Sequence, residues 1–420
     1  MSSVSFLEKL LDGVDVEWKA LGVVANLVRG NGLQKKDFTE EGVPAIHYGQ
    51  IYTYYGLSTK TTKSFVSPEL AGQLKRVDKG DVVITNTSEN LEDVGKALVY
   101  LGERHAVTGG HATIVKPGNC LLGKYFAYFT QTEEFAVEKR KHAKGTKVID
   151  VSATDMAKIK IPIPCPNNPK KSLKIQGEIV RILDTFTELT AELTAELTAR
   201  KKQYNYYRDQ LLSFEDGEVE WKTLGEIATI QRGASPRPIA KYITEDIDGV
   251  PWIKIGDTSP GSKYVNGTAQ KVTPAGAKMS RILGKGDFIV SNSMSFGRPY
   301  ILNIEGAIHD GWASISGFSD TLNSDYLYHY LSSNTVQNYW SGKINSGSVS
   351  NLNADIIKTL PVPVPSISKQ ENIAALLDKF DALTNSLTEG LPREIELRQK
   401  QYEYYRDLLL SFPKPAAVEA

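Results

Sequence analysis

Polar and cationic residues recur at four matched places in the two halves of this 420-residue chain. Amide, imidazole and guanidinium groups in loops are suited to hydrogen bonds with base edges and phosphate oxygens. Their repetition at the same places favours a shared binding role over chance. The candidates in the first half are Arg29, Asn31, His47, Tyr48, Gln50, Tyr54, Asn86, Thr87, Ser88, Lys141, His142, Lys144, Gly145 and Thr146. Those in the second half are Arg232, Arg237, Lys254, Asp257, Ser291, Asn292, Ser293, Arg298, Lys343, Ser346, Gly347 and Ser348.

Several of these residues also have a purely structural interpretation. Tyr48 and Tyr54 are equally consistent with core aromatics, and His47 with a surface residue whose hydrogen bonds are satisfied. We expect His309 and Trp312, which stand outside the candidate set, to lie in a domain interior.

The basic string EKRKHAKGTK also has two interpretations. A run of charges is usually a solvated helix face, whereas its position just before GTK favours phosphate contact. The lysines and arginine concerned are Lys139, Arg140, Lys141, Lys144 and Lys147. Glycines near such loops let backbone amides approach phosphates, although a tight turn explains Gly347 equally well.

Motifs for catalysis are missing from the sequence. It has no GxxxxGK[ST] phosphate loop, no glycine-rich dinucleotide fingerprint and no Asn-Pro-Pro-aromatic motif. Its two cysteines, Cys120 and Cys165, stand apart without the spacing of a zinc site or a disulfide framework. A self-contained nuclease or methyltransferase is therefore disfavoured, and we expect no metal site.

Composition indicates an ordinary soluble protein with two domains. Hydrophobic residues make up 41% and charged residues 23% of the chain, no apolar run has the length of a membrane span, and the N-terminus lacks a basic start. We therefore expect a cytoplasmic location. The 49 basic and 49 acidic residues cancel, which is unusual for a protein that holds DNA alone. Either the basic groups are segregated or a partner supplies charge.

The chain repeats itself at a spacing near 200 residues. VEWKALG at 16–22 returns as VEWKTLG at 219–225, and VPAIHYG as VPWIKIG. KGDVVITNTS is echoed by KGDFIVSNSM, GHATI by GWASI, KIKIPIPCP by IKTLPVPVP, and KKQYNYYRDQLLSF by QKQYEYYRDLLLSF. Each half is thus a variable globular segment followed by a helix.

The globular segments are expected to be α+β, because short β-rich runs alternate with helical stretches at 121–135 and 324–339. Proline-rich strings mark the exit from each domain. These patterns predict a first domain at 1–165, a first helical spacer at 166–214, a second domain at 215–365, a second spacer at 366–412 and a tail at 413–420.

Both spacers carry apolar residues at alternating steps of three and four, the seam of a coiled coil. Matching seams predict that the two spacers pack together. The first contains the tandem TELTAELTAELTA, whose four-residue unit inserts a stutter. Asp184 and Tyr204 are 20 positions apart, whereas Asp378 and Tyr402 are 24 apart. Gly390 should kink or loosen the second spacer, together with Pro392.

With these repeats, the chain resembles the DNA-specificity subunits of type I restriction-modification enzymes, and the TAEL tandem and YYRDxLLSF ends resemble the type IC branch. The resemblance implies two target-recognition domains related by a pseudo-twofold axis and joined by antiparallel helices. It also implies assembly with two methyltransferase subunits, and through them with motor and nuclease subunits. S-adenosylmethionine, ATP and magnesium would belong to those partners, with no cofactor in this chain.

The main alternative is a coiled-coil scaffold with two protein-binding heads, which the neutral charge supports and the repeated polar loops oppose. Because VEWK opens the first half before any long helix, the repeat is nearly circular. We therefore expect the N-terminal segment to pack beside the end of the final helix.

Overall fold

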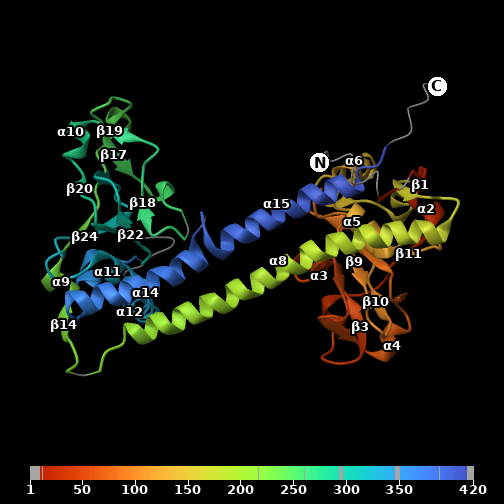
Figure 1. Ribbon diagram of the computed structural model, residues 1–420, viewed down its shortest axis with the longest axis horizontal. Coiled ribbons are helices and arrows are strands. Elements are labelled where there is room, and N and C mark those ends of the chain that lie inside the picture. The colour runs from red at the N-terminus through yellow and green to blue at the C-terminus, as the bar shows by residue number, and fades with distance from the viewer. Residues whose placement is uncertain are drawn as a thin grey trace. The chain divides into compact units, whose positions relative to one another are not determined.

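The computed structural model describes residues 10–11, 13–215, 217–259, 261–292, 297–345, 351–386 and 388–413. It forms two compact units (Figure 1). The first joins Met1–Leu189 to Arg398–Ala420, and the second comprises Thr190–Leu397. The chain thus leaves the first unit and returns to it at its C-terminal end.

Two sheets form the strand-rich part of the first unit. The larger has the order β2-β11-β7-β9-β4 and the smaller the order β5-β3-β10-β6. β-branched residues in runs such as VVIT are buried along the whole strand, because both faces of the sheet are covered. The strands are β2 (Ala25–Arg29), β3 (Val43–Ile46), β4 (Ser58–Thr59), β5 (Ser64–Val66), β6 (Lys75–Val77), β7 (Val82–Thr85), β9 (Ala97–Tyr100), β10 (Ala106–Thr108) and β11 (Ala112–Pro117).

The second unit repeats this topology. Its larger sheet runs β15-β24-β21-β22-β18, and its smaller sheet runs β16-β19-β17-β23-β20. The larger sheets match strand for strand, as the duplication predicts. The strands of these two sheets in the second unit are β15 (Thr229–Arg232), β16 (Ile243–Thr244), β17 (Val250–Ile253), β18 (Tyr264–Val265), β19 (Lys271–Val272), β20 (Arg281–Leu283), β21 (Phe288–Ser291), β22 (Pro299–Leu302), β23 (Gly306–Ile308) and β24 (Trp312–Ser316).

One sequence match is shifted by a residue in the structure. The sequence aligns GHATI with GWASI, which pairs His111 with Trp312. In the sheets, Gly30 N–H bonds to the carbonyl of Ala112, and Gly233 N–H bonds to that of Trp312. Ala112 and Trp312 therefore occupy equivalent positions, because the strand ladder rather than the short motif fixes the register.

Paired short helices cover each larger sheet. In the first unit they are α5 (Gly123–Phe129) and α6 (Glu133–His142), and in the second α11 (Ser324–Leu331) and α12 (Asn334–Asn345). Each predicted helical stretch is thus broken into two. The break follows from Thr132, whose hydroxyl accepts the Phe135 N–H and so starts a new helix.

The proline-rich exit strings form strands. The string at β13 (Lys160–Pro164) pairs with β1 (Val16–Ala20), and β25 (Pro361–Val364) pairs with β14 (Glu220–Thr223), both antiparallel. A short two-stranded sheet tolerates prolines because only one side of each strand is paired. The VEWK motif therefore closes its own domain by pairing with the exit.

Long helices follow each domain. Helix α8 runs unbroken from Pro169 to Leu211 and includes the whole TAEL tandem. The second spacer is interrupted, as predicted, between α14 (Ile367–Asn385) and α15 (Gly390–Leu410). Gly390 has φ +77°, and a Cβ there would lie 2.4 Å from the Ala382 carbonyl oxygen, so this turn requires glycine.

The helices pack antiparallel inside each unit. In the first unit, Phe186 of α8 stacks on Tyr405 of α15 with ring centroids 5.2 Å apart. In the second unit, Tyr204 and Tyr207 near the end of α8 stack on Phe380 of α14. The start of each spacer therefore meets the end of the other, which confirms the predicted seam.

The N-terminal segment packs where the circular repeat places it. Leu10 and Val14 contact the same core as Leu409 and Phe412 at the end of α15. This confirms that the end of the chain completes the first unit, in the way that the end of α8 completes the second.

Candidate nucleic-acid interface

Arg29 and Arg232 occupy equivalent places at the ends of β2 and β15. Arg29 pairs with Thr113 in the ladder and Arg232 with Ala313, at the same step of the adjacent strand. Arg29 Nε donates to the carbonyl oxygen of Gly110 at 3.1 Å, and Arg232 Nε to that of Asp310 at 3.4 Å. Both guanidinium groups are held from one side by a turn and remain exposed to solvent on the other.

Asp310 organises the cationic cluster in the second unit. Its carboxylate lies 3.5 Å from Arg237, which is 84% exposed, and 3.0 Å from His309 Nε2, and it accepts a hydrogen bond from the Ser235 hydroxyl. Although partial burial opposes it, these contacts hold the pKa of Asp310 below its usual value. The ionised carboxylate of Asp310 holds Arg237, and its main-chain carbonyl holds Arg232, so both arginines lie near one turn.

The expectation for His309 is wrong and that for Trp312 is confirmed. His309 is only partly buried, because its Nδ1 accepts the Gly311 N–H and keeps the ring in the turn. Trp312 is fully buried and donates to the carbonyl oxygen of Ile253.

An aromatic stack lies at the start of α3 (Tyr48–Thr53) in the first unit. The rings of His47 and Tyr48 are 4.6 Å apart, and Tyr48 lies 4.7 Å from His111 on the turn before β11. His47 caps the helix by accepting the Gly49 N–H and is buried, so it is not the surface residue of the structural interpretation. Burial lowers its pKa, with Lys35 and His111 adding to the effect.

Tyr54 is an exposed aromatic and not part of the core. Its side chain is 58% exposed, and the Lys63 ammonium lies 4.7 Å above its ring. Gln50, one turn earlier in α3, is held by a 2.6 Å hydrogen bond from its amide to the Ser64 hydroxyl. Tyr54 thus offers a flat aromatic surface beside a cation, a combination suited to nucleotides.

Four predicted strand-end residues lie beneath the surface. Asn86 and Thr87 are buried, as are Ser291 and Asn292. The Asn86 carboxamide oxygen accepts the Thr113 hydroxyl, and the Thr87 hydroxyl contacts His111 Nδ1 at 2.9 Å. These side chains tie the sheet to the turn before β11, so their burial corrects our placement of them in exposed loops.

Asn31 and Ser88 are two further candidates of the first unit that make contacts within the protein. The Asn31 amide donates to the carbonyl oxygen of Gln73, and Ser88 pairs with Ile149 in a short ladder. Asn31 is exposed and Ser88 is partly buried.

The basic string divides into a packed lysine and exposed ones. Lys139 is 7% exposed and donates to the carbonyl oxygens of Val94 and Glu92, and burial lowers its pKa. Lys141 and Lys144 have side chains 60% and 75% exposed, and their ammonium groups pair with Glu138 at 2.5 Å and with Asp155 at 2.8 Å. These two lysines are therefore accessible to a ligand, which would compete with their acidic partners.

The turn after this string has a structural need for glycine. Gly145 has φ +100°, and a Cβ would lie 2.0 Å from the Val148 carbonyl oxygen. His142 is partly buried at the end of α6, and Thr146 is exposed in the turn. The interpretation of Gly145 as a close phosphate contact is therefore not needed to explain it.

The remaining candidates of the second unit differ in their surroundings: some make contacts within their loop, one is exposed, and some lie outside the described residues. The Asp257 carboxylate accepts the N–H groups of Lys254 and Ala269, so it shapes its loop, while Lys254 Nζ donates to Gln270. Exposed Lys343 lies 5.5 Å from the ring of Tyr339. Four further predicted residues lie outside the described part of the chain: Ser293, Ser346, Gly347 and Ser348.

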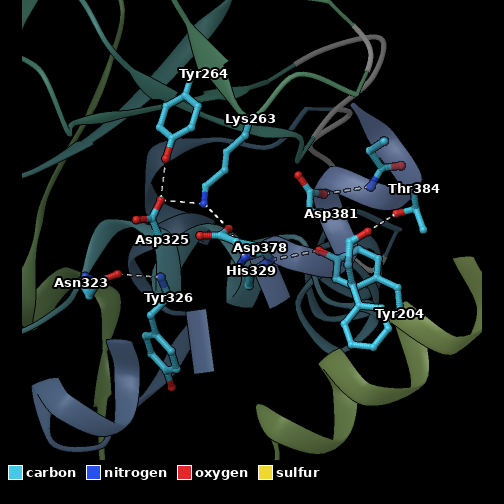
Figure 2. Close-up of polar contacts among 12 residues, drawn as sticks. Tyr204, Lys263, Tyr264, Asn323, Asp325, Tyr326, His329, Asp378, Asp381 and Thr384 are labelled. Carbon is cyan, nitrogen blue, oxygen red and sulfur yellow. Dashed lines mark hydrogen bonds and ion pairs between the residues drawn. The ribbon is translucent and has the colours of Figure 1, made fainter. Parts of the chain in front are cut away.

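A partly buried ionic cluster joins the sheet-bearing part of the second unit to its long helices (Figure 2). Lys263, 8% exposed, contacts Asp325 at 2.6 Å and Asp378 of α14 at 2.5 Å. His329 of α11 donates from Nε2 to Asp378 at 2.8 Å, and its Nδ1 meets the Tyr204 hydroxyl of α8 at 3.0 Å. The loop ahead of β18, the short helix α11 and the long helices α8 and α14 are thereby joined.

The first unit has a simpler version of this cluster. Lys124 of α5 contacts Asp184 of α8 at 2.8 Å, and the Tyr128 hydroxyl donates to the same carboxylate at 2.6 Å. Asp184 and Asp378 are the landmarks that the sequence repeat matches. The repeat alone did not reveal their ionic partners, because Lys263 lies just ahead of β18, 115 positions away from Asp378.

Within the described ranges, no group of three or more His, Cys, Asp or Glu residues is arranged to hold a metal ion. The helices of the same ranges include none with the length and apolar character to cross a bilayer.

Comparison with known proteins decides the family. The profile described as "Type I restriction modification DNA specificity domain" matches residues 13–200 and 217–397. The chain belongs to this type I DNA-specificity family. The two matches coincide with the duplicated halves. This chain therefore carries two DNA-specificity domains of the family.

Relatives in the family share the full length of the chain. It is 38% identical to the Escherichia coli protein named "Type I restriction enzyme EcoR124I/EcoR124II specificity subunit", with 100% of each chain covered. It is 31% identical to a putative specificity subunit of Haemophilus influenzae, covering 97% of this chain and 98% of that one. These relatives are recognition subunits and not catalysts, as we expected for this chain.

Solved structures confirm the fold. A structure from work on complex assembly and conformational transition of the type I system gives a TM-score of 0.63 at 15% identity, covering 94% of this chain and 97% of that chain. The S subunit from M. genitalium gives 0.55 at 16% identity, covering 96% and 98%.

Proposed function

We propose that this chain recognises a DNA target in two parts, one with each recognition domain, and positions methyltransferase subunits for adenine methylation. The observation that carries the proposal is the equivalence of Arg29 and Arg232, exposed guanidinium groups at the same ladder position of two duplicated domains. Arginine side chains in protein–DNA complexes contact phosphate oxygens and guanine edges. Two such surfaces in one chain fit a target with two separated half-sites.

Partners complete the proposed activity. Two methyltransferase subunits would bind, and motor and nuclease subunits would join through them for restriction. S-adenosylmethionine, ATP and magnesium would be held by those subunits. This division suits the balanced charge of 49 basic and 49 acidic residues, since a partner would add to the attraction for DNA. The cytoplasmic location belongs to the same proposal.

The helices would set the spacing of the half-sites. The boundaries proposed from the sequence place the spacers at 166–214 and 366–412, between and after the recognition domains. An added TAEL unit would lengthen α8 by about 6 Å at about 1.5 Å per residue. Because a base pair rises about 3.4 Å, that is one to two base pairs.

Mapping of methylated adenines would test the proposal. In a genome that carries this gene with its cognate methyltransferase gene, we expect one target made of two short half-sites with a fixed gap. A continuous target would contradict recognition by two domains. The scaffold alternative predicts that purified chain and methyltransferase neither form a complex nor bind duplex DNA.

A further inference from the structure

A polar cleft of about 360 Å³ lies between the helices and the recognition domain of the second unit. Its walls include Arg208 of α8, Arg298 ahead of β22, and Asp381 and Asn385 of α14. Figure 2 shows Tyr204 and Asp381, which also line it. None of these residues except Arg298 belongs to the predicted DNA-binding set.

Arg208 is a buried cation whose charge is poorly matched. It is 6% exposed, and its Nε has no hydrogen-bond partner among the described residues. The nearest carboxylate oxygen, on Asp209, is 3.6 Å from that nitrogen. The guanidinium is held in place by the Tyr204 ring, 5.2 Å away. Burying a guanidinium without a well-placed partner is costly, so the site has unused capacity for an anion.

The equivalent arginine of the first unit has no such capacity. Arg406 also lies over a tyrosine, Tyr402, at 5.8 Å. Asp407, however, accepts from its Nε at 2.8 Å through Oδ1, and the same oxygen lies 2.7 Å from its Nη2, so this guanidinium has a close carboxylate partner. The sequence Tyr-x-Tyr-Tyr-Arg-Asp is common to both halves. The difference therefore arises from tertiary structure.

Arg298 supplies a second cation to the same cleft. Its guanidinium lies 5.6 Å from the Tyr300 ring, and the side chain is partly buried. Asp381 is the one acid that lines the described cleft, and its carboxylate accepts a hydrogen bond from Asn385 at 2.9 Å. Among the lining residues, two guanidinium groups face one carboxylate, while Asp209, 3.6 Å from Arg208, lies outside the lining.

We propose that this cleft binds one phosphate of the DNA backbone between Arg208 and Arg298. Arginine is the side chain best suited to phosphate, because its planar group donates two parallel hydrogen bonds. DNA is favoured over a partner's carboxylate because Arg298, a member of the predicted DNA-binding set, lines this cleft. The inference rests on the proposed DNA-binding function, and it gives a long helix a direct part in holding DNA.

Salt-dependent DNA binding tests the site. The full chain, in complex with its cognate methyltransferase, is titrated onto a fluorescent duplex at several salt concentrations. We expect Arg208→Ala and Arg298→Ala each to weaken binding about fivefold to tenfold near 0.1 M salt and to reduce the slope of log K against log salt by about 1. The matched control, Arg406→Ala, should leave that slope unchanged.

Folding and alternative partners are controlled separately. Circular dichroism and Tm establish that each variant folds; if Arg208→Ala does not, Arg298→Ala and the charge-preserving Arg208→Lys carry the test. Unchanged slopes in folded variants would overturn this site alone. Loss of methyltransferase binding with DNA affinity intact would also overturn it, in favour of a partner carboxylate. A wild-type complex that does not bind DNA would overturn the proposed function itself.

Discussion

The indole nitrogen of Trp18 donates a hydrogen bond to the carbonyl oxygen of Pro413, 2.9 Å away, although 395 positions separate them in the chain. Trp18 also packs edge-on against Phe129. The beginning of the chain is thus fastened to its end inside one unit. Its repeat counterpart, Trp221, is 44% exposed. The two tryptophans of the repeated VEWK motif therefore differ in their contacts: Trp18 bonds to the end of the chain, whereas Trp221 is largely exposed.

Replacing Trp18 by phenylalanine should destabilise the first unit. The substitution removes the hydrogen bond and part of the aromatic packing, and we expect a loss of about 1–2 kcal/mol in the free energy of unfolding. Urea denaturation of the full chain measures it. Trp221→Phe is the control and should change stability by less than about 0.5 kcal/mol. Equal effects of the two substitutions would show that the link to Pro413 contributes nothing.

Removing either of the two equivalent strand-end arginines, Arg29 or Arg232, should weaken DNA binding. Arg29→Ala and Arg232→Ala each delete one exposed cation, and we expect each to lower the salt slope of DNA binding by about 1 if it contacts a phosphate. Fluorescence anisotropy with the methyltransferase complex measures this. Arg181→Ala removes a 67% exposed arginine of α8 that pairs with Glu178, and it should have no effect.

Lysines of the basic string should separate into two classes. The double substitution Lys141→Ala/Lys144→Ala should reduce DNA affinity and its salt slope, because both side chains are exposed and a DNA phosphate would compete with Glu138 and Asp155 for their ammonium groups. Lys139→Ala should instead lower stability, since it removes the hydrogen bonds to the carbonyl oxygens of Val94 and Glu92. Unchanged DNA affinity and slope in the double variant would leave these lysines as a solvated helix face.

Stability of the second unit should fall as the pH drops below neutrality, in part because of His329. Burial is the largest cause of its lowered pKa, and nearby Lys263 adds to it, while Asp378 and Asp381 oppose the shift. The unfolded chain therefore takes up a proton near pH 6.5, while the folded chain resists it. Stability is retained above that pH and lost as the pH falls through it.

A comparison of Tm at pH 7.5 and 5.5 checks this expectation. His329→Gln should reduce the difference in Tm between the two pH values, because the uncharged amide does not titrate. His105→Gln, at an exposed position, should leave the difference as in the wild type. If the two variants show the same pH dependence, the burial of His329 is not the cause.

The sequence by itself determined the duplication, because apolar periodicity and repeated motifs are local patterns that can be recognised from the order of the residues. The packing of the two spacers along matching seams and the interruption ahead of Gly390 follow from residue spacing and from the backbone freedom of one residue, whereas the antiparallel direction was implied only by the family resemblance. The return of the chain end to the first unit also follows from the order of the repeats. These features depend on which residues are apolar and how they are spaced.

Tertiary structure alone decided which polar side chains face outward. Asn86 and Tyr54 were equal candidates in the sequence, yet the first is buried against Thr113 and the second is 58% exposed. Arg208 and Arg406 share one motif, but only Arg406 forms a close pair with the aspartate that follows it. Burial and the partners of a charge depend on residues distant in the chain, so local spacing carries no record of them.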